Sequence, residues 1–354
     1  MSHSDSESEL TKRALLPAGL RDVLPLDAAH EAAVIEALLA RCASHGYDRV
    51  KPPLVEFETS LFAGPGAAMS DSTFRLMDPV SQKMMGVRAD MTVQIARIAT
   101  TRLKQEPRPL RLCYAGEVLR VSANQLNPER QLVQVGAELL GGDSVAADAE
   151  PVLLAVEALR AIGVTRLSVD LTAPRVIPIL LAGSDLPKDT LRSLRTAIDR
   201  KHTAEVRRLA GDLAPVITQL MDAAGSWQEA LDELSGIELP EAARAAIDRV
   251  AAIAKTVAEI GELGRGGRYQ VDGGDGIGST GFTLYMETVL RALPDPVRPD
   301  RLYLPSGTTV DRARALREQG WITIAALDKD PDPALEASRL GCTHILKDGA
   351  PVAL

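Results

Sequence analysis

The side chains best suited to ligand chemistry lie between Arg111 and Gly142, where the sequence predicts a strand, a polar loop and a second strand. In the second strand, Val133, Val135 and Leu139 alternate with polar residues, which is typical of a paired strand. The connecting Asn-Gln-Leu-Asn-Pro run has the composition of a turn, but it is longer than a tight hairpin. Long loops between strong strands often hold ligands.

Gln134, Gly136 and Glu138 follow one another at intervals of two, so their side chains share one face of the second strand. Arg120 ends the first strand and enters the same space. A cation, an amide and a carboxylate that converge over a sheet are the groups that would hold a zwitterionic amino acid. A solvated sheet face with an ordinary cross-strand Arg–Glu pair would give the same pattern. The pattern alone leaves both interpretations open.

This segment resembles motif 2 of the class II aminoacyl-tRNA synthetases, specifically that of histidyl-tRNA synthetase. In that family an arginine precedes the loop, and the return strand carries glutamine, glycine and glutamate. GEVLR, QVG and the Glu of GAE stand at matching places here. The resemblance covers most of residues 14–293. It implies an α+β fold, with an antiparallel class II sheet flanked by helices and a helical insertion at about 174–260, within a synthetase-like domain over 14–295.

Two further motifs extend the resemblance to a histidine pocket. RADMT stands where the synthetase has Arg-Pro-Glu-Gly-Thr, so Asp90 and Thr92 occupy the places of the acid and threonine that hold the substrate's amino group. Asp90 also has the position of a helix N-cap, and one carboxylate can serve both roles. Gly-Gly-Arg-Tyr at 266–269 resembles the family signature whose tyrosine lies at the pocket. The implied histidine-binding residues are Asp90, Thr92, Arg120, Gln134, Glu138 and Tyr269.

The elements expected to position these residues precede and follow motif 2. A helix is predicted from Asp27 to about His45, ended by Gly46 and followed by the strand YDRVKPPLVEF, whose two prolines favour an edge. Helix and strand together resemble motif 1, the class II dimerisation element. A hairpin is predicted around Asp78-Pro79, then a helix capped by Asp90. After motif 2 we predict a helix in AADAEPVLLAVEALRAIG and a strand in RLSVDL. GFTLYMETVLRAL resembles motif 3, a strand that leads into a helix.

The groups that the synthetase uses to handle ATP are depleted. Formation of an adenylate requires cations aimed at the developing phosphate charge. Arg120 is kept, but the motif 3 arginine position holds Thr288, and Ser122 replaces the motif 2 glutamate that holds the adenine. The Arg-Gly-Leu-Asp-Tyr-Tyr segment expected before Gly266 is absent. These departures, beside a better preserved histidine side, predict a chain that senses an amino acid without activating it.

The pattern is more similar to the regulatory subunits of ATP phosphoribosyltransferase than to the synthetase itself. That resemblance implies a non-catalytic subunit that assembles with the short catalytic phosphoribosyltransferase and mediates feedback inhibition by histidine in the first step of histidine biosynthesis. It also implies a self-dimer through motif 1, no tRNA and no cofactor. An active histidyl-tRNA synthetase and a stand-alone amino-acid-binding module are the alternatives.

Residues 297–354 alternate strand and helix, which predicts a small α/β domain with parallel strands. The domain occupies the place of the synthetase's anticodon-binding domain. Its basic residues are matched by as many acidic ones. Phosphate contacts supply most nucleic-acid affinity, so such a balanced surface is a poor reader of tRNA.

The amino-acid composition limits the number of domains, the cellular compartment and the kinds of site that we expect. The 354 residues are 45% hydrophobic and 25% charged, with a net charge of −8, which suits one large core and a smaller domain. Three widely spaced cysteines favour a reducing compartment, and they form no ligand-spaced cluster with the histidines, so no metal site is expected. Residues 1–13 are predicted to be a disordered tail. No apolar run reaches the roughly 18 residues of a membrane helix, so a cytoplasmic protein is expected.

Overall fold

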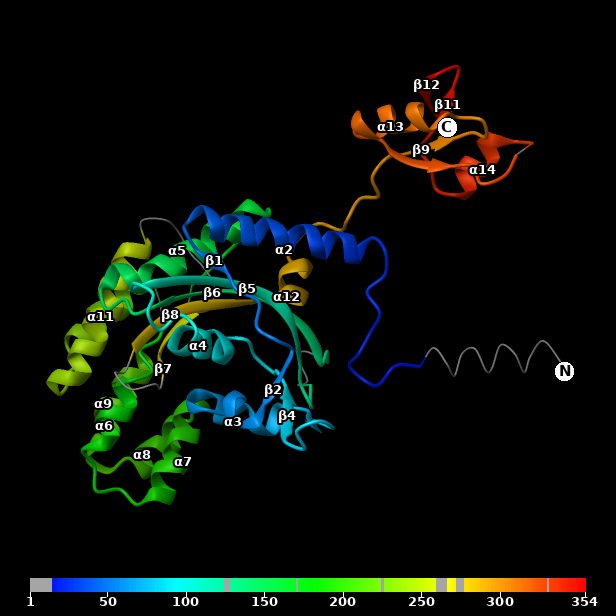
Figure 1. The fold of residues 1–354 in the computed structure, drawn as a ribbon. Coiled ribbons are helices and arrows are strands. Elements are labelled where there is room, and N and C mark those ends of the chain that lie inside the picture. Colours follow the sequence, from blue (N-terminus) through cyan, green and yellow to red (C-terminus); the bar gives the residue numbers. More distant parts are fainter. Residues whose placement is uncertain are drawn as a thin grey trace. The chain divides into compact units, whose positions relative to one another are not determined.

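The computed structural model describes residues 15–123, 128–169, 171–223, 226–258, 266–271, 277–329 and 331–354. Of residues 266–271 and of Ile277 only the backbone is described. The chain forms two compact units (Figure 1). The larger comprises residues 31–294 together with the N-terminal segment up to Val23, and the smaller comprises 295–354 together with 24–30. The pocket residues predicted from the sequence all belong to the larger unit.

The centre of the larger unit is a five-stranded sheet in the order β1-β5-β6-β8-β7. Its long middle strands run antiparallel, and β1 pairs with β5 in parallel. The strands are β1 (Asp48–Arg49), β5 (Leu110–Leu119), β6 (Gln131–Leu140), β7 (Gly266–Val271) and β8 (Ile277–Tyr285). β5 and β6 pair along all ten residues of each, which confirms the predicted strand, loop and strand. Residues 124–127 of the loop itself lie outside the described residues.

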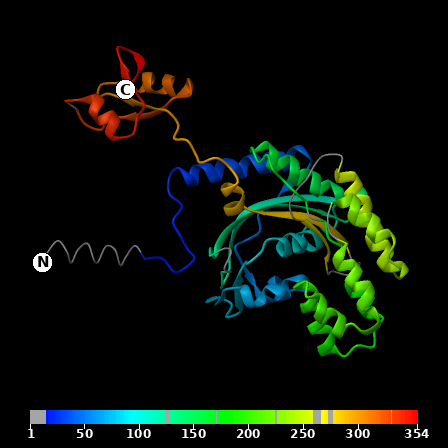
Figure 2. The same cartoon turned by 180° about the vertical axis from the view of Figure 1, so that it is seen from behind.

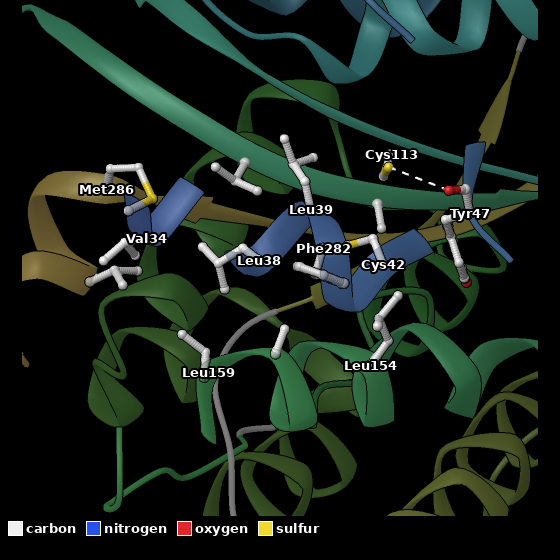
Figure 3. Close-up of a cluster of buried hydrophobic side chains, with 14 of the residues drawn as sticks. Val34, Leu38, Leu39, Cys42, Tyr47, Cys113, Leu154, Leu159, Phe282 and Met286 are labelled. Carbon is white, nitrogen blue, oxygen red and sulfur yellow. Dashed lines mark hydrogen bonds between the residues drawn. The ribbon is translucent and has the colours of Figure 1, made fainter. Parts of the chain in front are cut away.

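One face of this sheet is an apolar layer covered by three helices (Figure 3). α2 (Asp27–Ser44), α5 (Val145–Ala161) and α12 (Met286–Arg291) contribute side chains to a cluster with the sheet residues Cys113, Val135, Ala137 and Phe282. α2 confirms the predicted helix, and its buried residues Val34, Leu38, Leu39 and Cys42 recur at helical spacing. Burial of this layer holds the sheet against α2 and α5.

The opposite face carries α4 (Thr92–Thr101). Ile95 and Ala99 of this helix pack on Leu112 of β5 and on Leu132 and Leu140 of β6. Figures 1 and 2 show α4 on the side of the sheet away from α2. The two leucines of β6 lie at the ends of the strand, and the polar residues Gln134 and Glu138 lie between them. The first turn of α4 therefore stands directly beside the polar part of the sheet.

The predicted single strand over YDRVKPPLVEF is wrong, because the chain forms two short strands in different sheets. β1 ends at Arg49, and β2 (Val55–Phe57) joins a second sheet in the order β2-β4-β3. Pro52 and Pro53 lie between them and cannot donate to a strand ladder. Both strands are edge strands, as the prolines predicted. β3 (Arg75–Met77) and β4 (Met84–Val87) form the predicted hairpin. α3 (Glu58–Leu61) precedes this hairpin in the chain, and α4 follows it.

The described residues of 176–258 form a helical layer, whose last helix packs beside α5 (Figure 1). The helices are α6 (Val176–Ala182), α7 (Lys188–Asp199), α8 (Thr203–Leu209), α9 (Ala214–Asp222), α10 (Trp227–Ser235) and α11 (Glu241–Ala258). The predicted strand in RLSVDL is wrong for its described residues, 166–169 and Leu171, which pair with no sheet. They are exposed or half-buried, so β-branched content alone does not make a strand there.

An ion pair between a partly exposed arginine and a buried aspartate joins this helical layer to the central sheet. Arg249 of α11 donates through Nε to Asp148 of α5 at 2.6 Å, and Thr280 of β8 donates its hydroxyl to the other Asp148 oxygen at 2.6 Å. Asp148 is only 2% exposed. Its charge is therefore satisfied from two sides, by the insertion and by the sheet.

The smaller unit is a four-stranded sheet in the order β10-β9-β11-β12 with one helix on each face. Its elements are β9 (Arg301–Leu304), α13 (Val310–Glu318), β10 (Ile322–Ala325), α14 (Pro333–Arg339), β11 (His344–Lys347) and β12 (Ala350–Ala353). The parallel pairing of β9, β10 and β11 confirms the predicted α/β alternation. β12 was not predicted; it returns antiparallel to β11 through Asp348 and Gly349, both at positive φ. Of the helices that the structure describes, none has the length and apolar content to span a membrane.

Removal of the Arg249–Asp148 pair tests how much this contact between the helical layer and α5 contributes to the stability of the fold. We expect Arg249→Met to lower the free energy of unfolding by about 1–3 kcal/mol, because it removes the positively charged partner of a buried carboxylate. Urea denaturation followed by circular dichroism measures this. The control is Arg192→Met, whose partner Asp189 is exposed, and it should cost about 0.5 kcal/mol or less. Equal costs for the two variants would contradict the anchoring role.

Candidate functional site

The candidate pocket is built on the polar face of three adjacent strands. The register aligns Gly116, Gln134 and Tyr285 in one row across β5, β6 and β8, and Tyr114, Gly136 and Thr283 in the next. Glu138 and Gly281 face each other in the third row. Residues two apart along a strand share a face, so all three rows point toward α4. Residues that are far apart in the chain therefore meet in one layer.

Glycines in these rows make room for the large side chains beside them. A Cβ at Gly136 would overlap the phenol of Tyr114, and a Cβ at Gly281 would overlap the Glu138 carboxylate. Each large side chain thus occupies the space that a side chain at the neighbouring glycine would need. The close packing fixes the phenol and the carboxylate in place before any ligand arrives.

Gln134 holds the start of α4 against the sheet. Its Oε1 accepts the backbone N–H of Met91 at 2.9 Å, and its Nε2 donates to Asp90 Oδ2 at 2.7 Å. Asp90 Oδ1 accepts the N–H of Thr92 at 2.8 Å. The prediction that Asp90 caps α4 is wrong, because the N-cap residue is Met91 and the helix has no side-chain cap hydrogen bond. Asp90 precedes the cap, and its carboxylate accepts the Thr92 N–H and a hydrogen bond from Gln134. Since the Gln134 amide is fully buried and already paired, its contact with Asp90 orients that carboxylate.

Tyr114 is the centre of a second set of hydrogen bonds. Its hydroxyl lies 2.9 Å from Thr283 Oγ1 and 3.3 Å from Thr92 Oγ1, and it donates to Glu138 Oε1 at 3.4 Å. Ser279 donates its hydroxyl to Glu138 Oε2 at 3.4 Å. Burial, together with the Glu138 charge, holds the pKa of Tyr114 well above its usual range, so the phenol stays protonated. Thr92 and Glu138 are thereby joined through a neutral donor.

Arg120 supplies a positive charge at the other end of the rows. Its Nη2 donates to the Tyr285 hydroxyl at 3.0 Å, and its Cζ lies 5.3 Å from the centroid of the same ring. Its Nε lies 3.5 Å from the carbonyl oxygen of Ala89, next to Asp90. The Tyr285 hydroxyl is also 3.5 Å from Gln134 Nε2. The arginine and the Asp90–Gln134 pair are therefore connected through Tyr285.

The structure brings five of the six sequence-predicted residues into one network, namely Asp90, Thr92, Arg120, Gln134 and Glu138. The backbone of Tyr269 pairs with Ser279 at the edge of the same rows, but its side chain lies outside the described residues. Sequence reasoning missed Tyr114, Ser279, Thr283 and Tyr285. Tyr114 could have been found, because it lies two residues before Gly116 on the strand that ends near Arg120. The three residues of β8 depend on a register that the sequence does not show.

The positions predicted to lack ATP contacts lie apart from this network. Thr288 is exposed on α12, and its hydroxyl accepts a hydrogen bond from Arg291 at 3.3 Å. The neighbouring Glu287 accepts the backbone N–H of Val133 at 2.9 Å. Ser122 is exposed beyond the end of β5. Among the described side chains, no group of three or more His, Cys, Asp or Glu residues is arranged to hold a metal.

The site thus combines two carboxylates, a guanidinium and several hydroxyls, and the Glu138 carboxylate is almost fully buried. Tyr114 contacts Glu138, Thr92 and Thr283, and Thr92 also donates its backbone N–H to Asp90. Charged donors and acceptors held in fixed positions suit a small ligand that carries both signs of charge.

Known proteins resemble the chain along most of its length. Residues 19–262 match the family model described as histidyl-tRNA synthetase. A protein of Rhodospirillum centenum, called an ATP phosphoribosyltransferase regulatory subunit, is 46% identical and the match covers 95% of each chain. A protein of the same name from Paramagnetospirillum magneticum is 48% identical over 96% of this chain and 97% of its own.

Solved structures share the fold. A Bacillus halodurans protein described as an ATP phosphoribosyltransferase regulatory subunit/histidyl-tRNA synthetase superposes with a TM-score of 0.77 at 21% identity, covering 92% of this chain and 96% of its own. The histidyl-tRNA synthetase of Nostoc gives a TM-score of 0.72 at 16% identity, covering 95% and 91%. These likenesses confirm the predicted α+β class II fold.

The Tyr114 environment predicts a specific alkaline sensitivity. An unfolded tyrosine ionises near pH 10, whereas buried Tyr114 keeps its proton above that pH. The folded chain then binds more protons than the unfolded chain, so this one group lowers the free energy of unfolding by about 1.4 kcal/mol per pH unit as pH rises above 10. Tyr114→Phe should remove that part of the slope while lowering stability at pH 7. Urea denaturation between pH 7 and 11 measures both, and an unchanged slope would contradict the burial of the proton.

Proposed function

The chain belongs to the family of ATP phosphoribosyltransferase regulatory subunits, proteins with the histidyl-tRNA synthetase fold, and from this premise we propose its specific role. We propose that it activates the short catalytic form of ATP phosphoribosyltransferase and mediates feedback inhibition by histidine in the first step of histidine biosynthesis. The effector is free histidine, and the site is the pocket formed by β5, β6, β8 and the start of α4.

The observation that carries this proposal is the prebuilt constellation around Tyr114 and Gln134. Histidine carries an ammonium, a carboxylate and an imidazole. Asp90 and Thr92, held together at the first turn of α4, suit the ammonium. Arg120 suits the carboxylate, and Glu138, buried and hydrogen-bonded to Tyr114, suits an imidazole N–H. Tyr269 is included in the proposed site through the Gly-Gly-Arg-Tyr signature.

We propose that the chain has no catalytic activity of its own. An aminoacyl adenylate requires several cations around the phosphates of ATP. Thr288 is exposed and offers only a hydroxyl, already bonded to Arg291, and exposed Ser122 carries no charge. Arg120 is engaged by Tyr285. These features support binding of an amino acid without its activation.

The proposed assembly has two kinds of contact. A second copy docks through motif 1, formed by α2, β1 and β2, and exposed apolar side chains at this element, Leu54 and Phe57, support an interface there. The short catalytic subunit binds elsewhere. We propose that tRNA is not a partner, because the basic residues of the smaller unit are matched by acidic ones. The complex works in the cytoplasm.

Reconstitution with the short catalytic subunit tests the proposed role. We expect the mixture to form phosphoribosyl-ATP faster than the catalytic subunit alone, and histidine to inhibit only the mixture. The chain alone, given ATP, histidine and pyrophosphate, should show no adenylate-dependent exchange and should charge no tRNA. Exchange or charging would favour an active synthetase, and histidine binding without any effect on the catalytic subunit would favour a stand-alone binding module.

A single carboxylate tests whether this pocket is the histidine site. Glu138→Gln keeps the size and the neighbours of the side chain but removes the charge that would meet an imidazole N–H. We expect histidine inhibition and histidine binding to weaken by about tenfold or more, with activation of the catalytic subunit retained. Asp189→Asn, which neutralises an exposed carboxylate on α7, is the matched control and should change neither. Unchanged inhibition in Glu138→Gln would place the effector elsewhere.

A further inference from the structure

The Tyr285 ring lies next to the Arg120 guanidinium, and this geometry points to a role beyond support. We infer that Tyr285 is a specificity-determining residue that admits a single carboxylate to Arg120 and excludes polyphosphates. The inference rests on the proposed function only in taking the pocket's ligand to be an amino acid. It adds a steric and electrostatic cause for the exclusion of nucleotides.

The contacts of Tyr285 occupy much of the guanidinium. The ring lies over Arg120, with Cζ 5.3 Å from its centroid, and the hydroxyl accepts a hydrogen bond from Nη2 at 3.0 Å. Nε is turned toward the carbonyl of Ala89. The Tyr285 ring, the Tyr285 hydroxyl and the Ala89 carbonyl therefore already take up part of the Arg120 guanidinium and of its N–H donors. The donors left over suit one small oxyanion, whereas a polyphosphate chain needs an open fork and further cations.

The negative charge near Tyr285 also disfavours the binding of a polyphosphate. Its hydroxyl lies 3.5 Å from Gln134 Nε2, and that amide donates to the Asp90 carboxylate at 2.7 Å. Glu138 lies four residues further along β6 on the same face. A phosphate chain that displaced the ring would meet the negative charge of Asp90, which Gln134 holds on this side. A zwitterion instead places its own positive group beside Asp90 and only its carboxylate beside Arg120.

Tyr285 is rigidly placed by the fold. It is the last residue of β8, directly before α12, and its register partner on β6 is Gln134. Gly116, the next member of the row, has no side chain to displace it. The ring also packs against the apolar cluster around α4. Its position over Arg120 is therefore set by the sheet and does not depend on a bound ligand.

Binding of inorganic tripolyphosphate to the purified chain tests the inference without the catalytic subunit. Isothermal titration calorimetry should detect no binding to the wild-type protein. In Tyr285→Ala, we expect affinity for tripolyphosphate, and for ATP, to rise by about tenfold or more, because the guanidinium is exposed to a charged ligand. Tyr285→Phe keeps the ring and should remain close to wild type. Arg120→Met in the Tyr285→Ala background should abolish the gain.

Tyr285→Leu is a second variant that keeps apolar packing if Tyr285→Ala unfolds, and it should show the same gain. Histidine binding and the thermal unfolding midpoint report whether each variant keeps its pocket. A folded Tyr285→Ala or Tyr285→Leu protein without any gain in tripolyphosphate binding overturns the inference. So does wild-type binding of tripolyphosphate that Arg120→Met removes. A gain in these variants together with no histidine regulation of the catalytic subunit would instead refute the proposed function alone.

Discussion

The pairing of β6 with β5 on one side and β8 on the other is the constraint on which the rest of the molecule depends. Side chains alternate between the two faces of a strand, so a slip of one residue would exchange them. Gln134 and Glu138 would then enter the apolar layer under α2 and α5, and Val133 and Val135 would line the pocket. The hydrophobic layer therefore specifies the register, and the register specifies the polar constellation.

Within that register, the pocket is organised by hydrogen bonds that are complete without a ligand. Gln134 joins the sheet to the first turn of α4, and Tyr114 joins α4 to Glu138 and Thr283. Buried polar groups are costly when unpaired, so such a network fixes one arrangement of its members. Preorganisation of this kind suits a sensor, because little ordering is left for the ligand to drive. The Asp148–Arg249–Thr280 contact ties the same sheet to the helical layer.

Patterns within short stretches of sequence predict much of this architecture. Pairings between residues far apart in the chain determine the rest. The alternation in Gln131–Leu140 and the stripe of α2 are visible within a few residues, and both elements formed as predicted. The partnership of Gln134 with Tyr285 joins residues 151 positions apart, so no local pattern could reveal it. Pro52 and Pro53 predict edge strands, which the structure confirms. No local pattern shows that the chain passes from one sheet to another between β1 and β2. Asp348-Gly349 is a strong hairpin signal within the sequence, and β12 depends on this turn.

The hairpin that ends the chain has a consequence for colloidal behaviour. An open sheet edge presents unpaired N–H and C=O groups that can recruit strands from other molecules. β12 covers β11 and becomes an outer edge of the smaller sheet, and its second residue is Pro351, which has no N–H to offer. The strand is only four residues long. Because β12 is short and lacks one N–H donor, this edge is a poor template for pairing with strands of other molecules.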